Sequence, residues 1–204
     1  DLGLDYFRGG QFDLAERQFT HALEEQPNFP EATLALANTY YYRAKMLRAR
    51  SETKGAVDYL NGAIQRFQAA AAQIPDSAEP YMGLGMVYLE NPAFYPNAIE
   101  NLEKALTLDP QNQEKNVRAH FYLGSGYGLV GQFEKSKQHY FKYLEIFPAA
   151  PDWDQIQDIL VDIHRKLNQP YARQKQSGGA LEPTPSPEGA PAGETPAAEE
   201  PAPA

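Results

Sequence analysis

Residues 2–27 read LGLDYFRGGQFDLAERQFTHALEEQP, and the spacing of their small, apolar and aromatic residues returns three more times along the chain. In each copy a leucine precedes a small residue and then a tyrosine, and the copy closes on a proline. The four copies are Leu2, Gly3, Tyr6, Ala15, Phe19, Ala22, Pro27; Leu36, Ala37, Tyr40, Ala63, Phe67, Ala70, Pro75; Leu84, Gly85, Tyr88, Ala98, Leu102, Ala105, Pro110; and Leu123, Gly124, Tyr127, Ser136, Tyr140, Tyr143, Pro148. Self-similarity of this kind predicts a repeat protein built from one supersecondary unit.

The period of the pattern identifies the unit. Leu2 and Leu36 are 34 residues apart, and the closing prolines follow one another after 48, 35 and 38 residues. Each proline is expected to end a helix, because proline cannot continue the helical hydrogen-bond ladder. A 34-residue helical unit with small residues at fixed places resembles the tetratricopeptide repeat, over about residues 1–148. The resemblance implies an all-α, right-handed solenoid of four helix hairpins, in which stacked neighbours share a continuous core.

The rest of the chain is predicted to complete this array. We expect the repeats at about 1–29, 30–77, 78–112 and 117–149. A capping helix follows at 152–169, where Trp153, Ile156, Leu160, Ile163 and Leu167 recur at helical spacing on one side. The solenoid therefore spans residues 1–169. The remainder, 170–204, is rich in Pro, Ala and Glu and is predicted to be a disordered tail, because it cannot bury enough apolar surface to offset its ordering entropy.

The second repeat carries 14 extra residues between Tyr40 and Ala63. Divided between its two helices, they add about two turns to each, so a hairpin should rise past the neighbouring repeats. Its basic residues stand out in a chain of net charge −9; they are Arg43, Lys45, Arg48, Arg50 and Lys54. They form either a solvated helical surface or a contact for an acidic partner, an anionic lipid face or a glycan, and such an attraction would weaken with salt.

The resemblance also implies an inner groove lined mainly by the first helix of each repeat. Repeat register predicts the partner-binding residues Phe7, Leu34, Asn38, Tyr41, Tyr42, Met82, Met86, Leu89, Phe121 and Ser125. A lining with aromatic rings and methionines suits apolar peptides or helices. For each residue, packing between neighbouring helices is the alternative interpretation.

Catalytic and metal-binding motifs are missing from the sequence. The chain has no cysteine, which excludes disulfides, thiolate metal ligands and thiol catalysis. Its four histidines lack the spacing of a helical metal motif, and no nucleophile elbow, phosphate loop or dinucleotide fingerprint occurs. The glycines of 124–128 are assigned to close approach of a neighbouring helix or of a ligand backbone. We therefore expect no enzymatic activity, no metal and no cofactor.

Composition narrows the class of partner. The acidic balance argues against nucleic acid, and no apolar run is long enough to span a bilayer. We predict a protein–protein interaction scaffold or assembly factor, with one or more proteins as partners and a peptide or helix held in the groove. The alternatives are a permanently bound accessory subunit of a larger bacterial envelope complex and a binder of an anionic lipid or polymer through hairpin 43–54.

The expected location follows from similar reasoning. The first repeat begins in the middle of its first helix, so we expect a processed boundary at Asp1 and an N-terminal anchor that the sequence lacks. Proline- and alanine-rich tails resemble those of bacterial envelope proteins. The expectation is therefore the bacterial periplasm or cell envelope, with the cytoplasm as the alternative.

Overall fold

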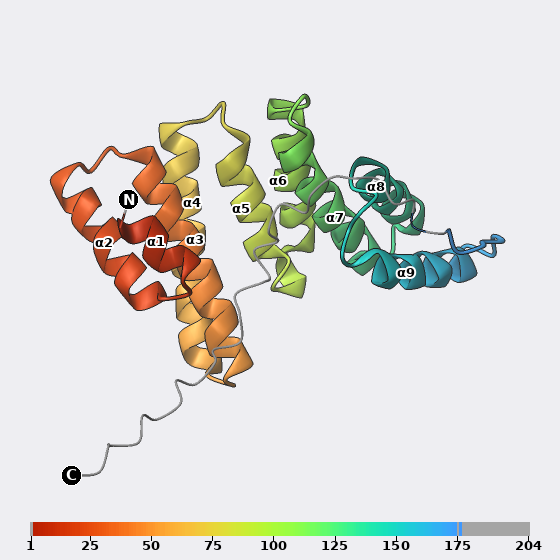
Figure 1. The fold of residues 1–204 in the computed structure, drawn as a ribbon, viewed down its shortest axis with the longest axis horizontal. Coiled ribbons are helices and arrows are strands. Elements are labelled where there is room, and N and C mark those ends of the chain that lie inside the picture. The colour runs from red at the N-terminus through yellow and green to blue at the C-terminus, as the bar shows by residue number, and fades with distance from the viewer. Residues whose placement is uncertain (1, 175, 177–204) are drawn as a thin grey trace, which may run out of the picture.

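A computed structural model describes residues 2–174 and 176, and within them the chain forms α-helices, one 3₁₀ turn and no strand (Figure 1). The helices are α1 (Leu2–Arg8), α2 (Phe12–Glu25), α3 (Pro30–Ala49), α4 (Thr53–Gln73), α5 (Ala78–Tyr88), α6 (Tyr95–Leu108), α7 (Gln113–Leu129), α8 (Phe133–Ile146) and α9 (Trp153–Lys166), with the 3₁₀ turn η1 at Pro92–Phe94. The predicted all-α solenoid is confirmed.

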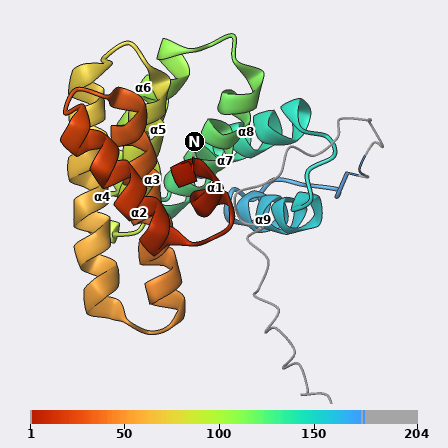
Figure 2. The ribbon, with the colours of Figure 1, turned by 60° about the vertical axis from the view of Figure 1, so that its left-hand side comes forward.

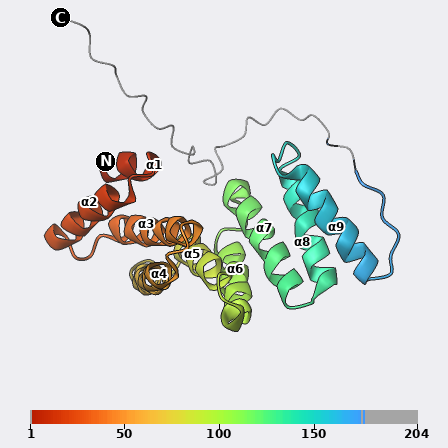
Figure 3. The ribbon, with the colours of Figure 1, turned by 90° about the horizontal axis from the view of Figure 1, so that it is seen from below.

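Helices pair in chain order and stack in a single array. The pairs α1–α2, α3–α4, α5–α6 and α7–α8 form four units, and each unit also contacts the next one. Viewed from below, the row is curved, with α1, α3 and α7 toward its inner side and α4 and α6 toward its outer side (Figure 3). First helices therefore supply much of the inner face, as the repeat register predicts.

The repeated small residues let the two helices of a unit approach closely. A Cβ added to Gly3 would lie 2.7 Å from the ring of Phe19, and one added to Gly124 would lie 2.9 Å from the ring of Tyr140. In both cases the two residues belong to the same unit. Phe19 and Tyr140 therefore fill space inside their own unit, because the small residue opposite leaves room for the ring.

Contacts between units use other glycines. Gly83 of α5 lies against the ring of Phe67 of α4, and Gly126 of α7 lies against Ile99 of α6. Gly126 and Gly128 sit inside a helix, where glycine costs about 1 kcal/mol relative to alanine. An added Cβ would lie 3.2 Å from Ile99 in the first case and 3.2 Å from Ser136 in the second, so both glycines serve close helix approach.

The long hairpin of the second unit is present. Helices α3 and α4 contain 20 and 21 residues, against 14 in α2, α6 and α8. Figure 2 shows their joined end reaching below the neighbouring helices. The turn is made by residues 50–52, with Ser51 in the left-handed region at φ 64°. Thr53 and Gly55, which follow the turn, belong to α4.

Helix α9 closes the array. Its apolar side packs on α8 and on Ala150 through the buried side chains Trp153, Ile156, Leu160 and Ile163. After α9 the chain turns at Asn168, which has φ 53°. Residue 175 and residues 177–204, most of the predicted tail, lie outside the described residues. Within the described part, no helix combines the length and the apolar character that a membrane crossing requires.

Candidate functional site

Aromatic rings from the first two units, carried by α1, α2 and α3, touch one another. The rings of Phe7 and Phe12 have centroids 5.7 Å apart, and Phe7 and Tyr42 are 5.5 Å apart. Tyr42 also lies 6.3 Å from Phe12 and 5.3 Å from Tyr41. Phe7, Phe12 and Tyr42 are half-buried, so each keeps part of its ring accessible. Aromatic pairs in this geometry hold one another in place and add about 0.5–1.5 kcal/mol beyond their burial.

A second group of rings lies on α7. Phe121 and Tyr122 have centroids 5.4 Å apart, and Phe121 also contacts Tyr143 at 5.5 Å. Burial raises the pKa of Tyr41, and the nearby hydroxyl of Tyr122 adds to the effect, so α3 and α7 approach each other here. We call the half-buried rings Phe7, Phe12, Tyr42, Phe121 and Tyr122 the inner aromatic face.

The predicted groove residues divide into two groups. Leu34, Tyr41 and Met86 are buried, with 8%, 3% and 3% of their surface exposed, and they pack between units. Half-buried positions, where a partner could touch the side chain, are Phe7, Asn38, Tyr42, Met82, Leu89, Phe121 and Ser125. Asn38 already donates a hydrogen bond of 3.0 Å to the Leu34 carbonyl. Partner binding by these seven residues stays a prediction. Phe12 and Tyr122, which the prediction lacks, are half-buried as well; repeat register does not specify the packing that leaves part of each ring accessible.

A carboxylate just after α5 holds the long hairpin to the third unit. Glu90 accepts a hydrogen bond from the Tyr41 hydroxyl at 3.3 Å and forms an ion pair with Arg48. The Glu90 side chain is 20% exposed and the Arg48 side chain 50% exposed, so the pair is partly open to water. Arg48 is therefore a structural contact between units two and three, and its charge is locally balanced.

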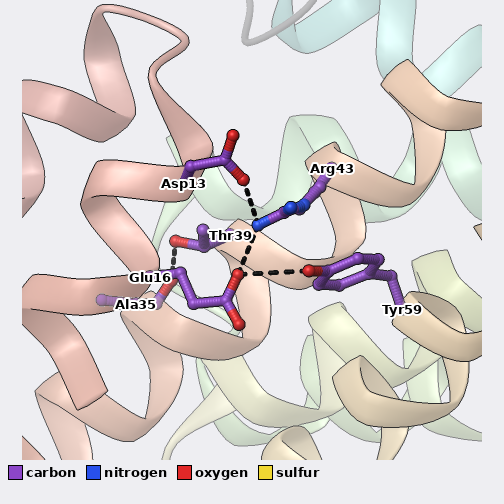
Figure 4. Close-up of polar contacts among 6 residues, drawn as sticks. All are labelled: Asp13, Glu16, Ala35, Thr39, Arg43 and Tyr59. Carbon is purple, nitrogen blue, oxygen red and sulfur yellow. Dashed lines mark hydrogen bonds and ion pairs between the residues drawn. The ribbon is translucent and has the colours of Figure 1, made fainter. Parts of the chain in front are cut away.

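Arg43 connects the long hairpin to the first unit, as Arg48 connects it to the third (Figure 4). Its guanidinium pairs with Asp13 and, at 2.5 Å, with Glu16 of α2, and it stacks 4.4 Å from the centre of the Tyr59 ring. The Tyr59 hydroxyl donates to Glu16 at 3.3 Å, and burial, followed by the negative charge of Glu16, raises the pKa of Tyr59 to about 12. These groups line an open depression of about 620 Å³. Asp13, Glu16 and Arg43 pair with one another inside this depression.

The predicted basic hairpin is thus not a uniform patch. Arg43 and Arg48 pair with carboxylates of the neighbouring units, while Lys45 lies 5.9 Å above the Tyr41 ring. Arg50 and Lys54 are exposed near the tip and form no ion pair within the described residues. Arg50 and Lys54 at the tip therefore present their charge outward as the sequence suggested, and Lys45 is exposed as well.

Two histidines meet between α7 and α8. The Nδ1 atoms of His120 and His139 are 2.9 Å apart, so one ring donates its proton to the other, and His139 also stacks on Tyr127. Burial lowers the pKa of both rings, that of His139 to about 4. No group of three or more His, Asp or Glu side chains suited to a metal occurs in the described part of the chain. The pair is neutral near pH 7.

Comparisons with known proteins agree on the repeat. Residues 1–71 match the family model described as tetratricopeptide repeat. A crystal structure of MamA aligns at 23% identity with a TM-score of 0.63, covering 82% of this chain and 85% of that one. TTC0263, a thermophilic TPR protein of Thermus thermophilus, aligns at 22% identity with a TM-score of 0.58 over 82% and 80%. MamA of Desulfovibrio magneticus RS-1 aligns at 18% with a TM-score of 0.62 over 82% of both chains.

No curated protein matches the sequence. At these low identities the solved structures establish the fold alone. That fold, with the match of residues 1–71, supports a protein–protein interaction scaffold in general terms.

Proposed function

We propose that this chain, a tetratricopeptide repeat protein, holds a peptide or helix of a partner protein against its inner aromatic face. The observation that carries the proposal is the set of touching, half-buried rings of Phe7, Phe12 and Tyr42. Large aromatic side chains are the commonest anchors of protein interfaces, because they bury much surface for little lost side-chain entropy.

The ion pairs described above support the same proposal. Arg43 fixes the hairpin to the first unit and Arg48 fixes it to the third, so the rings of units one and two are held in one arrangement. A surface that is ordered before binding loses less conformational entropy when a partner docks. No group within this face suggests catalysis, and we propose none.

The test is selection of binding peptides from a displayed peptide library on the intact protein. Selected peptides should lose at least about tenfold in affinity, or about 1.4 kcal/mol, for the Phe7→Ala and Tyr42→Ala variants. The matched control is Val57→Ala, which removes an exposed side chain from α4. Selected peptides that bind the Tyr42→Ala variant as tightly as the unchanged protein contradict the proposal, provided circular dichroism shows the variant folded.

A permanently bound accessory subunit of a bacterial envelope complex is the alternative form of this proposal, with the periplasm as its location. Its support is the cysteine-free, proline- and alanine-rich composition. A subunit without its partner should self-associate through exposed apolar surface at modest concentration. Analytical ultracentrifugation that finds a monomer over a wide concentration range argues against this form.

Binding of an anionic lipid or polymer is the second candidate, supported by Arg50 and Lys54 at the hairpin tip. Because Arg43 and Arg48 are paired internally, only part of the predicted patch is available. Sedimentation with anionic vesicles should be lost in the Arg50→Glu, Lys54→Glu double variant. Retention that is unchanged by this charge reversal, or absent from the unchanged protein, removes the candidate.

A further inference from the structure

A short extended segment of the chain lies on α9 at the end of the row. Residues 171–174, which we call the strap, run back along this helix (Figure 3). The Tyr171 ring stacks on His164, with centroids 4.2 Å apart and planes 17° apart, and it lies 5.9 Å from the ring of Phe141. His164 is buried and Phe141 is half-buried, so the tyrosine ring rests in a recess to which α8 and α9 both contribute.

The amide of Gln157 is the centre of the contact between α9 and the strap. Its Oε1 accepts a hydrogen bond from the Tyr171 hydroxyl at 2.7 Å and another from the backbone N–H of Gln174 at 3.0 Å. A backbone N–H can only donate, so the amide oxygen must be the atom that meets Gln174. Gln157 therefore recognises a main-chain group, which any extended peptide carries, and an aromatic hydroxyl.

A charged contact accompanies the aromatic one. Arg173 forms an ion pair of 2.8 Å with Asp158 and donates a hydrogen bond of 3.0 Å to the Asp154 carbonyl. The Arg173 and Asp158 side chains are 49% and 71% exposed. Exposed ion pairs of this kind contribute little to stability, but they select the charge of the segment that binds. This surface of α9 thus suits a cation two residues after an aromatic ring.

The strap leaves buried donors of α9 unsatisfied. Gln157 is 0% exposed, and its Nε2 has no hydrogen-bond partner among the described residues. The indole Nε1 of Trp153, one turn earlier on α9, is buried and without a partner in the same part of the chain. A buried donor that lacks an acceptor costs free energy. A ligand that offered acceptors here would therefore make hydrogen bonds that the strap does not make.

The link between α9 and the strap is held independently of the strap. The side chain of Gln169 accepts a hydrogen bond from Lys137 at 2.7 Å and donates one to Glu134 at 2.6 Å, both on α8. Three of the four strap residues are exposed, and Tyr171 is half-buried. The strap can consequently leave its place while α9 and the link keep their contacts.

We propose that the surface of α8 and α9 under the strap is a second peptide-binding site, which takes an extended partner segment with an aromatic residue and an arginine two residues later. The partner segment replaces the strap, in which Tyr171 and Arg173 have this spacing. Its ring stacks on His164, its arginine pairs with Asp158, and its main chain supplies an N–H to Gln157 Oε1 and a carbonyl to Nε2. The site shares no residue with the inner aromatic face and does not rest on the function proposed for it.

Binding of a labelled peptide tests the proposal. The probe has the sequence QPYARQKQ of residues 169–176, and the protein is the full chain with Tyr171→Ala and Arg173→Ala, which weakens the strap. Fluorescence anisotropy should show saturable binding to this double variant and at least about fivefold weaker binding to the unchanged chain, because the tethered strap competes at high effective concentration. A control peptide with alanine for the tyrosine and glutamate for the arginine should bind neither protein.

Charge reversal on α9 locates the binding. Asp158→Lys, added to the double variant, should weaken the probe at least about threefold, because it removes the partner of the arginine. Asp162→Lys is the matched control, since Asp162 lies one turn later on α9 and pairs with Arg165. This control should leave the affinity for the probe unchanged.

Three results overturn the proposal. The first is an absence of probe binding to a double variant that circular dichroism shows to be folded. The second is an equal loss of affinity in Asp158→Lys and Asp162→Lys. The third comes from sedimentation of the unchanged chain, where a dimer that Tyr171→Ala dissolves assigns the site to the strap of a second copy; we expect no such dimer.

Discussion

Replacing Gly83 with alanine should weaken the junction between the second and third units. Gly83 is buried in α5, and an added Cβ would lie 2.5 Å or less from three carbons of the Phe67 ring. Real Cβ atoms essentially never come within 3.0 Å of a neighbour, so the ring or the helix has to move. Phe67 is only 1% exposed, so its ring cannot move without displacing other buried groups. The clash is therefore expected to act on the packing of α4 against α5.

The expected magnitude balances two terms. Overpacking of a buried ring costs about 1–3 kcal/mol, toward the upper end here because three ring atoms are involved. Alanine gains about 1 kcal/mol over glycine as a helix former. The net loss of unfolding free energy should be about 2 kcal/mol, which lowers Tm by roughly 4–8 °C for a chain of this size.

Urea denaturation followed by circular dichroism measures the loss, and hydrogen exchange locates it. In a repeat array, weakening one interface should separate the opening of α1–α4 from that of α5–α9. The matched control is Gly55→Ala in α4, where the nearest atom to the new Cβ is the flexible end of Leu47 at 3.3 Å. That variant should be neutral or slightly more stable.

A double-mutant cycle decides whether the reasoning is right. Phe67→Leu makes room for the new methyl group, so the double variant should be more stable than the sum of the single effects by about 1–2 kcal/mol. A Gly83→Ala variant as stable as the unchanged protein refutes the argument. Strict additivity with Phe67→Leu refutes it as well, because the loss would then have another source.

Two further predictions concern polar groups. Glu16→Gln should lower the unfolding free energy by about 1–2 kcal/mol in a urea titration, because it leaves the partly buried Arg43 with one carboxylate fewer. Glu24→Gln, at an exposed position, is the control. Equal losses in the two variants contradict a stabilising role of the Arg43–Glu16 pair. Burial lowers the pKa of His139 to about 4 in the folded protein. Between about pH 4 and 6.5 the unfolded chain therefore binds more protons at this residue than the folded chain does. The unfolding free energy should be constant above pH 7 and should fall by about 1–3 kcal/mol between pH 7 and pH 4. His139→Gln should flatten this slope and His21→Gln should not; an unchanged slope in the first variant removes the explanation.

The fold could be predicted from the sequence because the features that determine it are local and recur in every repeat. A glycine beside a ring, as at Gly124 and Tyr140, sets the distance between two helices of one unit, and both residues lie within 16 positions of each other. The closing prolines set the helix ends, and the extra 14 residues had to lengthen α3 and α4. Such features recur at a fixed spacing, so a single chain shows them several times.

The residues of the candidate site could be predicted only in part, because repeat register gives the direction of a side chain but not the residues that surround it. Tyr41 and Tyr42 are adjacent in sequence, yet one is buried against Glu90 while the other keeps part of its ring exposed. That difference depends on how closely the third unit packs, which no local pattern states.

The sequence by itself thus determined the repeats, their order and the long hairpin. Only the tertiary structure decided which charges of the hairpin face outward. Arg43 pairs with Glu16, which is 27 residues away in the sequence, and Arg48 pairs with Glu90, which is 42 residues away. The physical reason is that an ion pair forms wherever stacking brings opposite charges together, and stacking is a property of whole units. The contacts of Tyr171 with Gln157 and His164 are decided in the same way, because the rest of the array holds α9 in place.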